Sequence, residues 1–416
     1  MHLPKFSMGI GDRFAHQGKA QLAAFVQAKS LGVTIAPVWN KSNREHSIVH
    51  STPATVRTEA AAAVNALHWA DPYFVDADHI GLKTVDNFLA SSDFYTVDVA
   101  DYIGKPAADS DIRAFVSSYR RYAGSLRIAG IAGALDISPE QIEAIARKYL
   151  FAAQEAARIY RHIESAKGKD QFITEVSMDE TDQPQTPVEL LFILAALADQ
   201  NVPLQTIAPK FTGRFNKGVD YVGDLAQFEK EFNDDLAVIA FAIQEFSLPQ
   251  NLKLSIHSGS DKFSIYGIIR QAIRRYDAGL HLKTAGTTWL EECIGLAAAG
   301  GDGLEIAKEV YRSALARFDE VCGPYATVID IDKNKLPSPD DVRHWTGEFF
   351  ASVLRHDQSC PRYNPHVRQL LHVGYKVAAE MGERYTAALE QYESTIAQNV
   401  TTNIFARHIQ PLFLPA

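Results

Sequence analysis

Three histidines each follow a short, largely apolar run of the sequence, a position that often marks the end of a β-strand. The runs cover residues 74–75, 254–256 and 279–280, and the histidines are His79, His257 and His281. Neutral imidazole is the commonest ligand for divalent transition metals, and three ligands with an open position are usual in a catalytic metal site. A single histidine in such a place is more often structural, so the metal interpretation depends on all three together. The cation would be zinc, manganese, cobalt or nickel, all of which accept imidazole.

Several carboxylates lie at similar positions. Because side chains alternate along an extended segment, Asp76 and Asp78 should share one side while His79 faces the other. In the strand predicted over residues 171–178, the apolar side should meet the helices, so Glu175 should point into the interior. There it needs a partner or a raised pKa. Asp78 and Glu175 are suited to general acid–base work, whereas a buried ion pair with a lysine is the structural alternative for Glu175.

Basic residues also gather after the predicted strands, although the protein as a whole is acidic. Arg13 follows the first strand, Lys210 the fifth and Lys262 the sixth. Guanidinium and ammonium groups bind carboxylates and phosphates. We therefore expect an anionic substrate held by Arg13, Lys210 or Lys262. A Schiff base between Lys210 and a carbonyl substrate is a rival interpretation that the histidines leave open.

The elements that would position these residues alternate between strands and helices along most of the chain. Apolar, β-branched runs separated by amphipathic segments predict seven or eight parallel strands, and no Gly-rich dinucleotide fingerprint is present. The pattern predicts an α/β fold, a (β/α)8 TIM-type barrel in which functional groups collect at the carboxyl ends of the strands. A β-branched run at residues 327–331 is a further candidate strand.

Two stretches depart from this alternation. Residues 85–165 are predicted to be helical throughout, as an insertion after the third strand that could cover the barrel as a lid. Residues 340–416 are predicted to form a helical C-terminal extension. We therefore expect a single catalytic barrel domain over residues 1–416 with these two additions, rather than two or three separate domains.

The composition excludes several classes of protein. The chain has 416 residues and a formal net charge of −9 without a basic block, which disfavours binding to nucleic acid. No apolar run is long enough to span a membrane. The cysteines, Cys293, Cys322 and Cys360, lie far apart, which is typical of a cytoplasmic protein and restricts a metal site to nitrogen and oxygen ligands. We expect a small-molecule substrate, and the sequence is compatible with a homo-oligomer.

Several segments of the chain resemble the tagaturonate epimerase family. They cover residues 9–17, 76–81, 174–180, 257–264 and 371–375, so the resemblance spans nearly the whole chain. It implies a metal-dependent enzyme that interconverts D-tagaturonate and D-fructuronate. It also implies that His79, His257 and His281 hold the metal and that Asp78 is the base. The acid would be Glu175 or Glu180, and the facing of the strand favours Glu175.

The reaction itself restricts the mechanism. The two ketouronates differ at the hydroxyl-bearing carbon β to the ketone, whose hydrogen the carbonyl does not acidify. We therefore expect retro-aldol cleavage, rotation of the aldehyde fragment and aldol re-addition, with a base for the hydroxyl and a metal for the enediolate. A metal-dependent aldolase, or a ketose epimerase or isomerase for a related sugar, is the alternative enzyme. A non-catalytic barrel that binds sugar acids is the alternative without catalysis.

Overall fold

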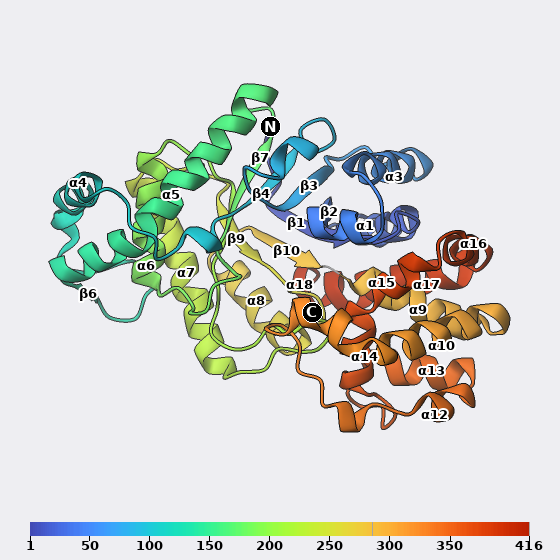
Figure 1. Ribbon diagram of the computed structural model, residues 1–416. Coiled ribbons are helices and arrows are strands. Elements are labelled where there is room, and N and C mark those ends of the chain that lie inside the picture. Colours follow the sequence, from blue (N-terminus) through green and yellow to red (C-terminus); the bar gives the residue numbers. More distant parts are fainter. Residues whose placement is uncertain (285, 416) are drawn as a thin grey trace.

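A closed barrel of eight parallel strands forms the centre of the molecule in the computed structural model, which describes residues 1–284 and 286–415 (Figure 1). Around the barrel the strands follow the order β1-β10-β9-β8-β7-β4-β3-β2. The predicted (β/α)8 barrel is therefore confirmed. The strands are β1 (Phe6–Gly11), β2 (Ala36–Ser42), β3 (Phe74–Ile80), β4 (Phe94–Asp98), β7 (Ile173–Ser177), β8 (Thr206–Ala208), β9 (Lys253–Ile256) and β10 (Leu280–Thr284).

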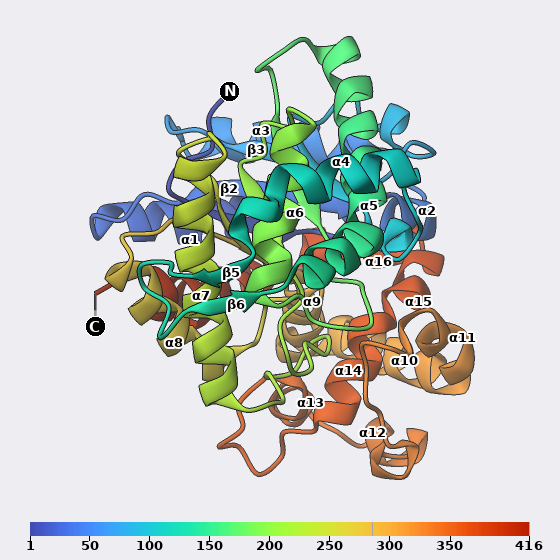
Figure 2. The ribbon, with the colours of Figure 1, turned by 90° about the vertical axis from the view of Figure 1, so that its left-hand side faces the viewer.

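Helices connect most of the strands and bury their outer side. Several begin where the sequence supplies a cap: Thr186 and Glu189 form a capping box ahead of α6, and Ser138 caps α5, each just before a proline in the first turn. In Figure 2, α4, α5 and α6 lie on the side facing the viewer. The helices around the barrel are α1 (Gly18–Ser30), α2 (Asn43–Ile48), α3 (Pro53–Ala66), α4 (Asp109–Tyr119), α5 (Pro139–Lys167), α6 (Pro187–Asp199), α7 (Leu225–Glu245), α8 (Phe263–Arg275) and α9 (Thr287–Ala299).

The segment 85–165 differs from its prediction, because it contains the fourth barrel strand. Residues 94–98 form β4, which pairs with β3 on one side and with β7 on the other. The run contains two aromatic and two β-branched residues and is almost completely buried, which suits a central strand. The same segment also holds a short antiparallel pair, β5 (Gly124–Leu126) with β6 (Leu135–Ile137), besides α4 and α5. The prediction of an entirely helical insertion is therefore wrong.

The C-terminal part of the chain is helical and lies on one side of the barrel (Figure 1). It packs mainly against α9 and α1. The expected strand at residues 327–331 is not formed; these residues connect two short 3-10 turns, and β4 completes the barrel instead. The C-terminal helices are α10 (Gly301–Ala316), α11 (Phe318–Cys322), α12 (Pro339–Arg343), α13 (Gly347–Leu354), α14 (Pro365–Val373), α15 (Tyr375–Glu380), α16 (Glu383–Gln391), α17 (Glu393–Thr402) and α18 (Gln410–Phe413).

A buried carboxyl group on α9 should make the docking of these helices sensitive to pH. Glu291 is 3% exposed and its Oε1 accepts a hydrogen bond of 2.9 Å from Asn403 Nδ2. Burial raises the pKa of Glu291 from 4.5 to about 7. Below the pKa of the unfolded chain the carboxyl is protonated in both states, so its burial costs the folded protein little. Above that pKa the unfolded chain gains a charge that burial opposes in the folded protein, and stability is lost until the pH passes the folded pKa. Glu291→Gln should therefore raise the free energy of unfolding by about 3 kcal/mol at about pH 8 and by little at about pH 5.

Denaturant unfolding at the two pH values measures this difference. The exposed Glu393→Gln on α17 is the control and should show no gain that depends on pH. An equal change for Glu291→Gln at both pH values would mean that the buried carboxyl does not titrate in this range.

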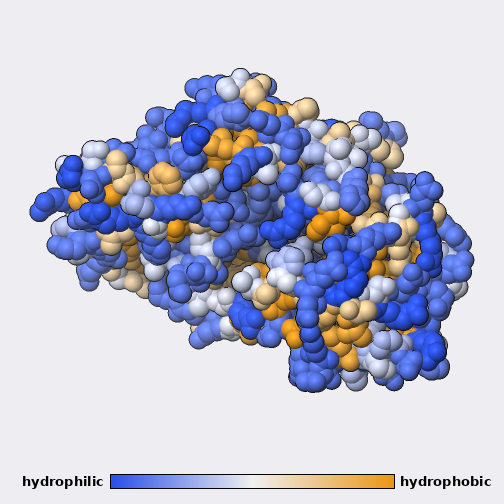
Figure 3. Space-filling model, in the orientation of Figure 1, coloured by the Kyte–Doolittle hydropathy of each residue, from blue (hydrophilic) through white to orange (hydrophobic). Residues whose placement is uncertain are grey.

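The surface shows no large apolar face in the view of Figure 3, where hydrophobic residues appear as small patches within a mostly hydrophilic surface. Among the described residues, no helix has the length and apolar character needed to cross a membrane.

Candidate active site

A cavity of about 470 Å³ opens at the carboxyl ends of the barrel strands. Its volume lies within the range of about 300–1,000 Å³ that is usual for small-molecule sites. Asp78 and His79 reach it from β3, Asp98 from β4 and Lys283 from β10, while His257 directly follows β9. The strand ends thus bring together residues that are as much as 205 positions apart in the sequence.

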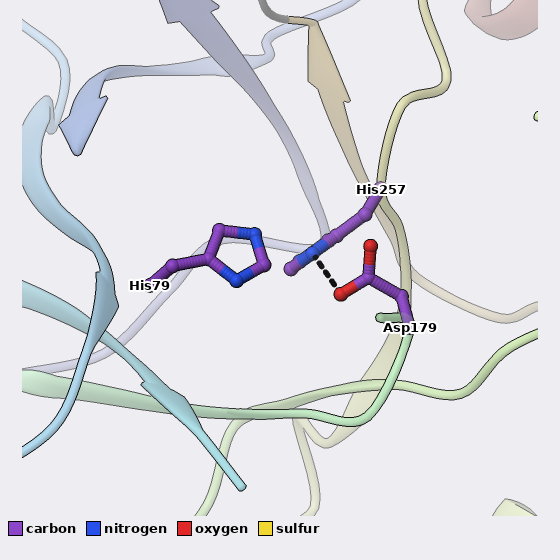
Figure 4. Close-up of side chains that lie close together, drawn as sticks. All are labelled: His79, Asp179 and His257. Atoms are coloured by element: carbon purple, nitrogen blue, oxygen red, sulfur yellow. Dashed lines mark hydrogen bonds and ion pairs between the residues drawn. The ribbon is translucent and has the colours of Figure 1, made fainter. Parts of the chain in front are cut away.

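Two histidines and a carboxylate meet in this cavity. His79, His257 and Asp179 each offer a ligand atom, and the three atoms lie within 4.8 Å of one another. His257 Nδ1 is 3.0 Å from Asp179 Oδ1, and the ring of His79 faces them from the opposite wall (Figure 4). Two imidazoles and a carboxylate at this spacing form a donor set that suits a divalent transition metal.

His79 reaches the cavity because the β3 strand is irregular at this residue. The pairing of β3 with β4 shifts register between Ala77 and Ile80, and His79 has a φ of 50°. A bulge of this kind redirects one side chain, and left-handed backbone at a residue other than glycine often marks a functional position. The irregularity brings Asp78 and His79 into the same cavity, although regular alternation would separate them.

Carboxylates also hold the two histidine rings from behind. His79 Nδ1 is 2.9 Å from Asp98 Oδ2, and His257 Nε2 is 2.8 Å from Glu175 Oε1. Metal-binding histidines usually have such a partner on the second nitrogen, which fixes the orientation of the ring. Burial lowers the pKa of His257, but Asp179 and Glu175 outweigh it and raise the value to about 9.

Next to the histidines, one buried lysine balances three carboxylates. Lys283 Nζ lies 2.6 Å from Asp78 Oδ1, 2.7 Å from Asp76 Oδ2 and 3.1 Å from Glu175 Oε1. Burial opposes the charge, but these carboxylates raise the pKa of Lys283 well above its ordinary value. Burial raises the pKa of Asp76 to about 7, whereas Lys283 and His79 overcome burial at Asp78 and lower its pKa to about 2. The cluster therefore contains one carboxyl that can take up a proton near neutral pH.

Gly9 gives Lys283 the room for this position. Strand β1 pairs Gly9 directly with Lys283 of β10, and a Cβ atom on Gly9 would lie 3.0 Å from the lysine Cγ. A larger residue would displace the lysine stem.

The sequence model of the tagaturonate epimerase family matches residues 1–412. The chain belongs to this family. It is accordingly an epimerase, of the isomerase class.

The tagaturonate/fructuronate epimerase of Thermotoga maritima is 28% identical over 98% of this chain and 80% of its own length. Two crystal structures of the fructuronate-tagaturonate epimerase from Cohnella laeviribosi, both with glycerol, are also similar. One is 25% identical with a TM-score of 0.79, covering 98% of this chain and 81% of its own. The other is 24% identical with a TM-score of 0.82, covering 100% and 83%.

In this member of the tagaturonate epimerase family, His281 does not join the other two histidines. It is the second residue of β10, near the amino end of the strand, and does not end it as the sequence suggested. Its Nδ1 is 2.9 Å from Ser7 Oγ, and its ring centre is 5.2 Å from that of Phe94. Burial lowers the pKa of His281 to about 3. Lys283 follows two residues later on the same side of β10, closer to the carboxyl end of the strand, and lines the cavity.

The three basic residues predicted to bind substrate lie in different surroundings. Arg13 lines the cavity, but its guanidinium pairs with Glu45 and lies 4.5 Å from the ring centre of Tyr375. Lys210 lines an adjoining cavity and donates to the carbonyl of Thr181. Lys262 lies outside the lining formed by the described residues. It is fully buried and donates to three backbone carbonyls, those of Asn216, Val219 and Ser260.

Glu175 points into the barrel, as its strand pattern predicted. It has no exposed surface, and among the described residues the cavity lining includes Glu180 but not Glu175. Glu175 forms a buried ion pair with Lys283, which is the structural alternative stated for this residue.

Three residues of the site were not predicted from the sequence. Asp98 was missed because its strand was not recognised. Asp179 and Lys283 also follow apolar runs of the sequence, but neither was among the residues predicted to form the site. All three lie at or just beyond the carboxyl end of a barrel strand, the position from which the other site residues were predicted.

Proposed function

We propose that the enzyme interconverts D-tagaturonate and D-fructuronate by metal-dependent retro-aldol and aldol chemistry. The observation that carries the proposal is the position of the Asp78–Lys283 pair beside the His79–His257–Asp179 group in one cavity. Membership of the tagaturonate epimerase family supports the choice of substrate.

The donor set fits a divalent cation. Six carboxylates and four lysine or arginine side chains line the cavity: Glu45, Asp78, Asp98, Asp101, Asp179 and Glu180 against Arg13, Arg44, Lys217 and Lys283. Protonated His79 and His257 would balance this difference, and a divalent cation bound to their neutral forms would supply the same charge of +2. We propose His79, His257 and Asp179 as the ligands, with Asp179 in the place that the sequence assigned to His281. When bound, the cation supplies an electrophile that polarises the ketone and stabilises the enediolate.

Asp78 is placed to accept the proton of the substrate hydroxyl. As the proton leaves, the bond between the β- and α-carbons breaks and its electrons form the enediolate. Lys283 contacts both Asp78 and Asp76, so it can take a proton from Asp78 while it gives one to Asp76, whose pKa burial raises to about 7. Re-addition to the other face of the aldehyde returns the proton, and no atom or electron is gained or lost.

The second face of the aldehyde needs a second proton carrier. Glu180 lines the cavity, and we propose it for this role in place of Glu175. Glu175 then serves as a positioning residue, because its Oε1 holds both His257 Nε2 at 2.8 Å and Lys283 Nζ at 3.1 Å.

Incubation with D-tagaturonate in deuterium oxide tests the reaction. We expect D-fructuronate to form without deuterium at the inverted carbon, because its hydrogen stays on the aldehyde. Deuterium at that carbon would contradict the retro-aldol route, and net release of two fragments would identify an aldolase.

Metal content tests the ligand set. The purified protein should contain one divalent cation per chain and lose it in His79→Ala and His257→Ala. His281→Ala removes a buried histidine of the same barrel and should retain the metal. His281 pairs with Ser7, further from the carboxyl ends of the strands than the Gly9–Lys283 pair that borders the cavity. Metal loss in His281→Ala alone would return that residue to the ligand set. Elemental analysis of the purified variants measures all of these outcomes.

A further inference from the structure

Among the residues that the structure describes, two basic side chains of the cavity form no ion pair with an acidic group. Arg44 of α2 and Lys217 line both the active-site cavity and the adjoining one of about 450 Å³. Over residues 1–284 and 286–415, no carboxylate forms an ion pair with either side chain. The other basic groups nearby are already paired or hydrogen-bonded: Arg13 to Glu45, Lys210 to Thr181, Arg214 to Asp330 and Lys283 to its three carboxylates.

Tyr325 lies beside both of these cations. The guanidinium carbon of Arg44 is 5.8 Å from the centre of the Tyr325 ring, and Lys217 Nζ is 5.9 Å from it. The Tyr325 hydroxyl is 3.0 Å from that of Tyr375, which fixes the ring. Two cations on one aromatic ring form a binding surface for an anion that is independent of the carboxylate-rich histidine group.

We propose that Arg44 and Lys217 bind the carboxylate of the substrate and hold the aldehyde fragment that carries it during epimerisation. This inference depends on the proposed function. Numbered from the carboxylate, the third carbon is inverted and the fifth is the ketone. Cleavage therefore leaves the first three carbons as an aldehyde with the carboxylate and the last three as the enediolate of dihydroxyacetone. A cation held by His79, His257 and Asp179 would stabilise only the second fragment, the enediolate, so the first needs its own anchor while it rotates.

Kinetics of Lys217→Met test the recognition of the carboxylate. We expect kcat/KM for D-tagaturonate to fall by about 10- to 100-fold, mainly through KM, because a charged hydrogen bond is lost. D-tagatose has the same ketone end but no carboxylate, and its inhibition constant should change by less than about twofold. Lys217→Arg should keep most of the affinity. Arg214→Met, whose charge is already paired with Asp330, is the matched control.

Release of dihydroxyacetone tests whether the aldehyde fragment stays bound, because the enediolate cannot be re-added once that fragment has left. Lys217→Met and Arg44→Met should release it at least about tenfold more often per turnover than the wild-type enzyme. Unchanged KM and unchanged release in both variants would overturn the subsite, as would an equal loss of affinity for D-tagatose. If the wild-type enzyme itself does not epimerise D-tagaturonate, the proposed function fails. If it does and the variants behave normally, only the subsite fails.

Discussion

Asp78→Asn is expected to lower kcat by about 100- to 10,000-fold while the metal stays bound, because a positioned general base contributes about that factor. Asparagine keeps the shape of the side chain and its contact with Lys283, but it cannot accept the hydroxyl proton. The metal should remain because Asp78 is outside the group formed by His79, His257 and Asp179.

Steady-state kinetics combined with metal analysis measure both halves of this prediction. Asp86→Asn is the control, since Asp86 is a largely exposed carboxylate shortly after β3 that pairs with His162. A near-normal kcat in Asp78→Asn would assign the base to Asp76 or Glu180. Loss of the metal would instead make Asp78 a ligand.

Lys283→Met should destabilise the folded protein by about 3–5 kcal/mol, the usual cost of removing one partner from a buried ion pair. The substitution leaves Asp76, Asp78 and Glu175 close together without the ammonium group that all three share. Activity should be lost as well, since the proton path between Asp78 and Asp76 is interrupted.

Urea unfolding measures the loss of stability, and a second substitution identifies its cause. Asp76→Asn in the Lys283→Met background should restore at least about 1 kcal/mol, because it removes one of the repelling charges. Lys333→Met breaks an exposed pair with Asp319 on α11 and should cost less than about 1 kcal/mol. If Lys283→Met alone does not fold, comparison of the double variant with Asp76→Asn gives the same information. No recovery in the double variant would contradict the electrostatic explanation.

The barrel was predictable because most of its strands are short apolar runs separated by amphipathic helices. Strand β4 was the exception. Its five residues lie between a 3-10 turn and a predominantly helical stretch, so their alternation was too short to outweigh the surrounding pattern. The neighbours that define it, β3 and β7, are separated from its ends by 13 and 74 intervening residues, as the element bounds show. Such pairing cannot be read from a local pattern.

The sequence showed which residues lie near the ends of strands, but not which of them face the cavity. His79 and His257 were predicted from their positions after strands, but the choice between His281 and Lys283 depends on the register of β10. The β1–β10 pairing places His281 beside Ser7 and Lys283 beside Gly9, one layer closer to the cavity. A single sequence does not contain this offset, because two residues on the same side of a strand look equivalent. The bulge at His79 is invisible for a similar reason.

That bulge also limits which residues could replace His79 in the proposed metal site. A φ of 50° at residue 79 is tolerated well by glycine, asparagine and aspartate and poorly by β-branched residues. Of these three, asparagine and aspartate offer oxygen ligands and glycine offers none. The backbone therefore keeps open a short mutational route from imidazole toward oxygen, the ligand that manganese and magnesium favour, and closes most others.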